Sequence, residues 1–134
     1  MEKVKTKKII VKPEIDSCVI EKVLQDSETE KQVIVHCEFV NGFESQLIRI
    51  WPTTYLCDRN SSHKSKLLNA FNITLFPTWL QLEPLTIFNF TLVFTGLPKS
   101  CKMFDLVEEI PQSGGFYQGK IKRNKSDVYT IRIN

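Results

Sequence analysis

Hydrophobic and polar residues alternate along several short stretches of this chain. Residues 33–40 read VIVHCEFV and residues 89–95 read NFTLVFT, so that every second side chain is apolar in both stretches. Side chains of a β-strand point alternately to its two faces, so each stretch would bury one face and expose the other. The pattern predicts β-strands packed over a hydrophobic core.

The same pattern, interrupted by proline, glycine and asparagine, predicts the other elements. A short helix is expected after Ser61 or Ser62, either of which would cap it, because Leu67, Ala70 and Phe71 would then share one helix face. Residues 103–110 alternate less regularly and fit either a strand or a helical turn. We expect strands at residues 8–12, 17–25, 33–40, 46–50, 53–57, 72–76, 78–82, 85–95, 116–123 and 127–133.

These elements predict an all-β fold, an immunoglobulin-like β-sandwich of about seven to nine antiparallel strands with one short helical segment. A chain of 134 residues is long enough to bury a core without metals or disulfides. Residues 1–8 are rich in lysine and are expected to form a basic, mobile tail. Residues 9–134 are expected to form the single sandwich domain.

The order of four segments resembles that of bacterial telokin-like, immunoglobulin-like domains. The segments are a polar hairpin at residues 26–30, VIVHCEFVNG at 33–42, QLIRIWPTTYLCD at 46–58 and NFTLVFTGLP at 89–98. In those domains a strand ending in Asn-Gly precedes one ending in Tyr-Leu-x-Asp, and a Phe-Thr-Leu-x-Phe strand follows a loop. The resemblance covers residues 17–109. It implies the sandwich fold and a binding or accessory role, and it brings no catalytic motif.

Charge and the amino terminus bear on location and partners. The net charge of +3 is too small to indicate nucleic acid as a partner. The basic start, MEKVKTKK, is followed by only a short apolar run, whereas a secretory signal needs roughly 7–15 apolar residues. No segment approaches the roughly 20 apolar residues of a membrane span. We therefore expect a cytoplasmic protein. The alternative is a secreted protein whose leader was removed. The telokin-like domains that the sequence resembles are commonly exported or lipid-anchored.

Cysteine and histidine do not form a recognisable catalytic or metal-binding motif. Cys18, Cys37, Cys57 and Cys101 are far apart in sequence, and without a Cys-x-x-Cys pair we expect neither a metal nor a cofactor. In a reducing compartment they would be buried as small apolar residues, although disulfide pairing stays open. A small hydrolase that joins Cys57 or Cys101 to His63 across space is the least favoured function.

Aromatic and basic residues offer two candidate binding sites. Trp51, Tyr55 and Trp79 lie in or beside proline-containing stretches, and exposed aromatics of this kind bind sugars or peptides, although they more often cover the end of a core. Four basic residues lie in the last predicted hairpin near Phe116 and Tyr117, an arrangement that can grip single-stranded nucleic acid. We instead interpret this hairpin as a charged edge that resists unwanted strand pairing. Its basic residues are Lys120, Lys122, Arg123 and Lys125.

The carboxylates do not predict a catalytic acid–base pair. Glu108 and Glu109 are adjacent, so in a strand their side chains would point to opposite sides. Since no polar cluster fits catalysis, we expect a non-enzymatic binding or accessory module that recognises another protein through a sheet face or end loops. The alternative is a carbohydrate-binding module that uses Trp51, Tyr55 and Trp79.

Overall fold

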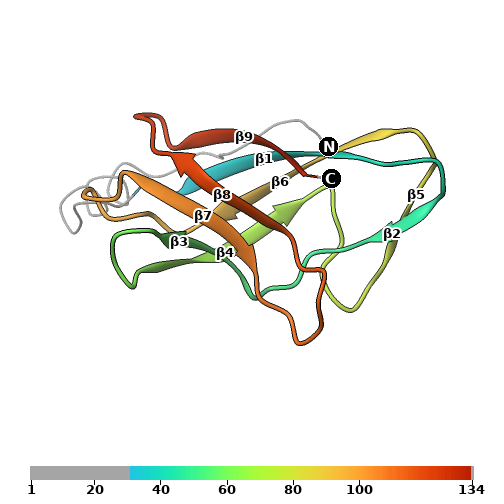
Figure 1. The fold of residues 1–134 in the computed structure, drawn as a ribbon, viewed down its shortest axis with the longest axis horizontal. Coiled ribbons are helices and arrows are strands. Elements are labelled where there is room, and N and C mark those ends of the chain that lie inside the picture. Colours follow the sequence, from blue (N-terminus) through green and yellow to red (C-terminus); the bar gives the residue numbers. More distant parts are fainter. Residues whose placement is uncertain (1–30, 134) are drawn as a thin grey trace, which may run out of the picture.

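The computed structural model describes residues 31–133, which form nine β-strands and no helix (Figure 1). The expectation of an all-β fold is confirmed for this part of the chain. The strands are β1 (Val33–Val40), β2 (Gln46–Ile48), β3 (Thr54–Asp58), β4 (Lys64–Phe71), β5 (Leu80–Leu82), β6 (Ile87–Phe94), β7 (Met103–Glu108), β8 (Tyr117–Lys122) and β9 (Val128–Ile133).

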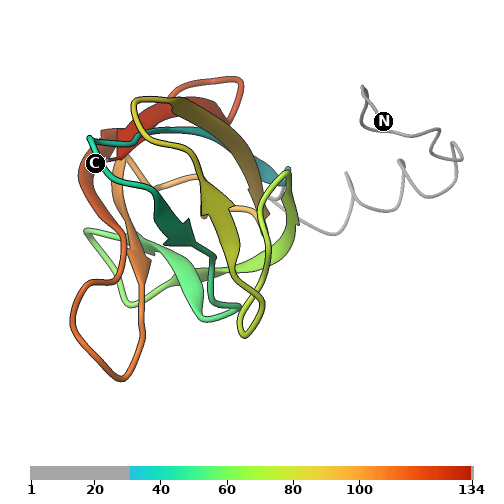
Figure 2. The same cartoon turned by 90° about the vertical axis from the view of Figure 1, so that its right-hand side faces the viewer.

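Seven strands form one curved sheet in the order β8-β7-β3-β4-β6-β1-β9. β4 joins the two parts of this sheet, because its first half pairs with β3 and its second half with β6, with a bulge between Leu67 and Asn69. The sheet curls into an incomplete barrel, which Figure 2 shows from one end. Its edge strands, β8 and β9, follow one another in sequence, but neither pairs with the other.

The pairing of β1 with β9 is parallel, whereas the other strand pairs are antiparallel. The prediction of antiparallel strands throughout is therefore wrong at this edge. A parallel pair needs a long connection between its strands, and here most of the described chain lies between β1 and β9. A short-range turn signal cannot reveal such a pair.

The hydrophobic core fills the interior of the incomplete barrel. The alternation predicted for β1 and β6 is confirmed, because buried residues of the two strands are paired with one another. Val35 is paired with Leu92, and Cys37 is paired with Phe90. Phe104 of β7 meets Tyr129 of β9 edge to face, with ring centroids 5.0 Å apart, and so joins the two parts of the sheet. Burying each large apolar side chain contributes about 1.5–3 kcal/mol.

The short helix expected after Ser61 or Ser62 is absent, and its residues form β4 instead. The bulge in β4 explains the error. An extra residue in a strand interrupts the two-residue alternation, so Leu67 and Ala70 both pack against the core and imitate the spacing of a helix face. Pairing on both sides of β4 outweighs the helical tendency of so short a segment.

Two other predicted elements are corrected or decided by the structure. Residues 72–76, predicted as a strand, contribute only a single bridge, between Leu75 and Ile50. Residues 103–110, which fitted a strand or a helical turn, contain strand β7. The remaining strands lie within a few residues of their predicted bounds.

Strands β2 and β5 form a separate two-stranded ribbon beyond one end of the barrel (Figure 1). The Asn41 side chain holds its base, because Nδ2 donates a hydrogen bond to the Glu83 carbonyl oxygen at 2.6 Å. Nearby, the Leu85 amide donates to the Gly42 carbonyl at 2.7 Å. The Asn-Gly turn signal of the sequence thus marks the point where the chain leaves the barrel for the ribbon.

Some predictions lie outside the described residues. They are the basic tail at 1–8, the strands at 8–12 and 17–25, and any role of Cys18.

Within residues 31–133 the buried apolar residues form one cluster. No helix in this part of the chain is long and apolar enough to cross a membrane.

Candidate functional site

A groove lies where the ribbon meets the open end of the barrel. It encloses about 840 Å³ and is bordered by β2, by the loop between β7 and β8, and by the ends of β1 and β9. Both tryptophans of the chain line it, together with Leu47, Arg49 and Tyr117.

The side chain of Arg49 is held among aromatic rings on one side of the groove. Its guanidinium carbon lies 3.6 Å from the ring centroid of Trp79 and 4.6 Å from that of Phe76. Phe76 in turn stacks on Trp51 with ring centroids 3.9 Å apart. A guanidinium is attracted to the face of an aromatic ring, so this stack fixes the orientation of Arg49.

The hydrogen-bonding capacity of Arg49 is mostly unused. Nη1 donates to the Pro77 carbonyl oxygen at 3.0 Å, whereas the buried Nε has no partner. Nη2 donates no hydrogen bond to any described residue, and none of those residues forms an ion pair with this guanidinium. A guanidinium carries five N–H donors, and only one of those on Arg49 has a hydrogen-bond partner among the described residues.

Glu108 also lines the groove and is buried. Its two carboxylate oxygens accept hydrogen bonds from the backbone amides of Trp51 and Phe116, both at 2.9 Å. Burial raises the pKa of Glu108, while these amide donors and the nearby charge of Arg49 act in the opposite direction. The carboxylate thereby anchors both the segment before β3 and the start of β8, and it has no oxygen free of a protein partner.

The loop between β7 and β8 depends on Gly115. A Cβ atom at this position would lie 2.4 Å from the Glu108 carbonyl oxygen, which is too close for any other residue without movement of the backbone. Glu109 points away from Glu108 and forms an exposed ion pair with Lys64 at 2.6 Å. The expected opposite orientation of these two carboxylates is therefore confirmed.

The three predicted aromatic site residues do not lie together. Trp51 and Trp79 share the groove, but Tyr55 is on β3 and is absent from the groove lining. The Lys64 ammonium lies 4.8 Å from the Tyr55 ring centroid. Arg49 and Phe76, which complete the cluster, were missed because neither alternation nor a known motif marks them. The signal available was local: Arg49 is two residues before Trp51, and Phe76 precedes the Pro77-Thr78-Trp79 stretch.

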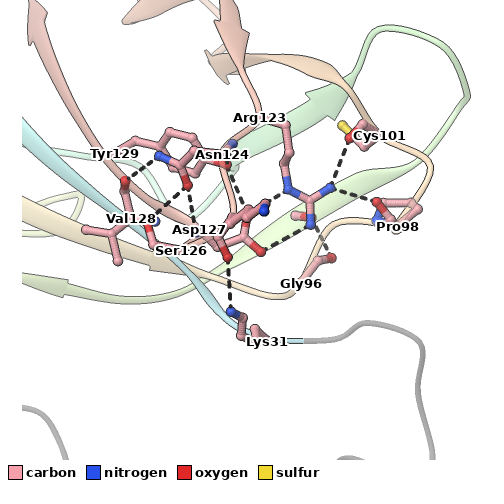
Figure 3. A network of polar contacts seen from close by, with 12 residues as sticks. Lys31, Gly96, Pro98, Cys101, Arg123, Asn124, Ser126, Asp127, Val128 and Tyr129 are labelled. Carbon is pink, nitrogen blue, oxygen red and sulfur yellow. Dashed lines mark hydrogen bonds and ion pairs between the residues drawn. The ribbon is translucent and has the colours of Figure 1, made fainter.

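The predicted basic hairpin is not a uniform basic surface. Arg123 instead forms an internal network (Figure 3), in which Nε and Nη2 donate to the two Asp127 oxygens at 2.6 and 3.1 Å. Its Nη1 donates to the carbonyls of Pro98 and Cys101. The Tyr129 hydroxyl also donates to Asp127, and burial raises the pKa of this tyrosine to about 12.

Of the other three basic residues, Lys120 lies at a positive φ of 55°, and its backbone amide donates to Asp105 at 2.9 Å. Lys122 is on β8, and Lys125 lies in the turn between β8 and β9. The ammonium groups of these three lysines form no ion pair in the described part of the chain. The ion pair between Arg123 and Asp127 therefore organises the turn. The positive charges of this hairpin that form no ion pair with described residues are those of the three lysines.

His63 and Cys101 form hydrogen bonds with different partners and not with each other. The Ser65 hydroxyl donates its only hydrogen to the Gly96 carbonyl at 2.9 Å, so it must accept from His63 Nε2 at 3.0 Å. His63 is therefore a donor here. Cys101 directs its thiol toward the Met103 carbonyl, and burial raises the pKa of both Cys101 and Cys57. No cysteine–histidine hydrogen bond occurs between residues 31 and 133.

The described residues contain no cluster of histidine, cysteine and acidic side chains that could hold a metal ion. Comparison of the chain with protein-family models, with curated proteins and with solved structures gave no match. The site is therefore interpreted from its own geometry.

Proposed function

We propose that this chain is a non-enzymatic binding module that recognises another protein through the groove between the ribbon and the barrel. The observation that carries the proposal is the groove itself, with large apolar side chains exposed along its rim. Leu47, Trp79 and Tyr117 are 55%, 50% and 58% exposed. Concave surfaces that combine such side chains with a few fixed polar groups are typical of binding sites.

The backbone around the groove favours an extended protein segment as the ligand. β2 pairs only with β5, and β8 pairs only with β7, so each has one edge without a partner strand in the described chain. Gln46–Ile48 of β2 and Tyr117 and Gln118 of β8 also line the groove. An extended segment gains main-chain hydrogen bonds when it adds to a strand edge, while its side chains enter neighbouring pockets.

The carbohydrate alternative has less support from this geometry. Sugar binding on aromatic side chains needs an open ring face, and each tryptophan has at most one, because Arg49 covers one face of Trp79 and Phe76 covers one face of Trp51. Tyr55 is outside the groove. The same arrangement suits a peptide, which needs exposed ring edges and apolar rims as much as open faces.

The finer fold type is also part of this proposal. We propose that the incomplete barrel is a variant of the immunoglobulin-like sandwich, related to the bacterial telokin-like domains that the sequence resembles. The single apolar core between two facing parts of the sheet supports it. We also propose a cytoplasmic location. Its support is that Cys37, Cys57 and Cys101 form no disulfide with one another.

Selection from a random peptide library tests the proposed function. Trp51 and Trp79 are the only tryptophans in the chain and both line the groove, so tryptophan fluorescence reports binding at this site. With libraries that omit tryptophan, we expect selected peptides to change this fluorescence in a saturable manner. Leu47→Ser on the rim should weaken their binding about tenfold or more, as loss of an interface anchor does.

Leu68→Ser is the matched control, because Leu68 is 50% exposed on β4 and does not line the groove. This variant should bind the selected peptides as the natural chain does. Absence of any selected peptide, or equal loss of binding in both variants, would contradict the proposal. A fluorescence response to oligosaccharides in place of peptides would favour the carbohydrate alternative.

A further inference from the structure

We propose that the groove selects segments that carry a carboxylate, and that Arg49 is the residue that binds it. This inference rests on the proposed function, because it names the chemistry that the same groove recognises. The ligand group is the side chain of aspartate or glutamate, or the carboxyl terminus of a protein. Arg49 is thus assigned a specificity-determining role.

The position of the guanidinium supports this assignment. Trp79 at 3.6 Å, Phe76 at 4.6 Å and the Pro77 carbonyl at 3.0 Å hold it in one orientation at the groove wall. Each of the two Nη nitrogens retains a hydrogen without a partner among residues 31–133. Two parallel N–H groups match the two oxygens of a carboxylate, and a pre-oriented guanidinium loses little entropy on binding.

Neither of the other two charged side chains that line the groove forms a hydrogen bond or an ion pair with Arg49. Glu108 uses both oxygens to accept hydrogen bonds from backbone amides. Arg132 forms an ion pair with Glu38 at 2.6 Å. The charged side chains that line the groove are two arginines and one glutamate, so its formal charge is positive and favours an anionic ligand.

A protein carboxylate fits better than an isolated anion. The unpaired edges of β2 and β8 offer hydrogen bonds to a backbone, and the rim offers apolar contacts to neighbouring side chains. The carboxylate would then fix the register of an extended segment, while the apolar contacts would add buried apolar surface to the interface. Recognition by planar, paired hydrogen bonds also explains why arginine serves here where lysine would not.

The test compares two peptide libraries, one that contains aspartate and glutamate with free carboxyl termini, and one that lacks acidic residues and is amidated. We expect binders from the first library only. Replacing the acidic residue of a binder with its amide should weaken binding to the natural chain about tenfold or more. The same replacement should change binding to the Arg49→Gln variant less than about twofold, since the partner group is already lost.

Amidation of the carboxyl terminus alone separates the two sources of the carboxylate. Arg49→Lys keeps the charge but loses the paired geometry, so it should bind acidic peptides more weakly than the natural chain does. Binders of equal strength from the acid-free library would overturn the role of Arg49 while leaving the proposed function intact. A lack of binders from either library would contradict both.

Discussion

Two arginines of this protein use the same chemical group in opposite ways. Arg123 has three of its guanidinium nitrogens bound, to both oxygens of Asp127 and to two backbone carbonyls. Arg49 has one hydrogen bond to a carbonyl and is otherwise in contact with aromatic rings. The first uses four of its five N–H donors within the domain, and the second uses one among residues 31–133.

Under the proposed function, this difference is one between a stabilising role for Arg123 and a binding role for Arg49. Arg123 joins the turn between β8 and β9 to residues 98 and 101, so its contacts hold distant segments together. Arg49 is oriented by Trp79 and Phe76 but not neutralised. Buried polar groups without partners cost stability, and Nε of Arg49 is such a group among the described residues.

The largest effect is expected when the Arg123 network is broken. Asp127→Asn leaves a partly buried guanidinium without its carboxylate and should lower the free energy of unfolding by about 3 kcal/mol. Asparagine tolerates the positive φ of 56° at this position, so the backbone is not the cause. Denaturant unfolding measures the change. Glu38→Gln, which removes the exposed partner of Arg132, should cost far less, and equal losses would contradict the comparison.

A smaller loss is expected at Glu108. Glu108→Ala leaves the backbone amides of Trp51 and Phe116 without acceptors and should lower the free energy of unfolding by about 2 kcal/mol. The neighbouring Glu109→Ala removes only an exposed ion pair and should leave stability nearly unchanged. Thermal unfolding of the two variants gives the comparison. If both were equally stable, Glu108 would not anchor the groove wall.

Arg49 itself should contribute little to stability. Arg49→Lys loses one hydrogen bond and part of the aromatic stacking, and we expect a decrease of no more than about 1 kcal/mol. The corresponding Arg123→Lys variant should lose more, because lysine cannot reproduce the paired bonds to Asp127. Denaturant unfolding of both variants under one set of conditions compares the two losses in the free energy of unfolding. A larger loss at Arg49 would assign it a structural role.

The smallest effect concerns pH. Burial raises the pKa of Glu108 above its unfolded value, so the folded state holds this proton more tightly. The part of the folding free energy that is linked to this proton is therefore full below the unfolded pKa and is lost as pH rises through the folded pKa. Arg49→Gln removes a nearby positive charge and should raise the pKa of Glu108 further. Carboxyl chemical shifts measured across a pH titration show the direction, and a lowered pKa would contradict the proximity of the two groups.

Strand alternation in the sequence was enough to predict most of the barrel. Residues 33–40 and 89–95 alternate because each has one face on the core, and both form strands as expected. The helix error arose where a bulge between Leu67 and Asn69 breaks that alternation. The parallel pairing of β1 with β9 depends on contacts between distant residues, which no local pattern encodes.

The candidate site was predicted only in part, for a similar reason. Trp51 and Trp79 were noticed as aromatics beside prolines, and they do meet in the groove. Arg49 was not noticed, because its importance comes from the groups around it and from the partners it lacks. Conversely, Arg123 was grouped with three lysines by charge alone, whereas the fold brings Asp127 against it.

The most direct test of this account observes the two guanidinium groups in solution. The ¹⁵N-labelled full chain is titrated with acetate, with neutral acetamide as the control, and the Nε–H signals of Arg49 and Arg123 are followed. Arg49→Lys assigns the first signal. We expect acetate to shift the Arg49 signal in a saturable manner and to leave the Arg123 signal unchanged. Equal responses at both arginines, or none at Arg49, would contradict the claim that Arg49 is free to bind a carboxylate.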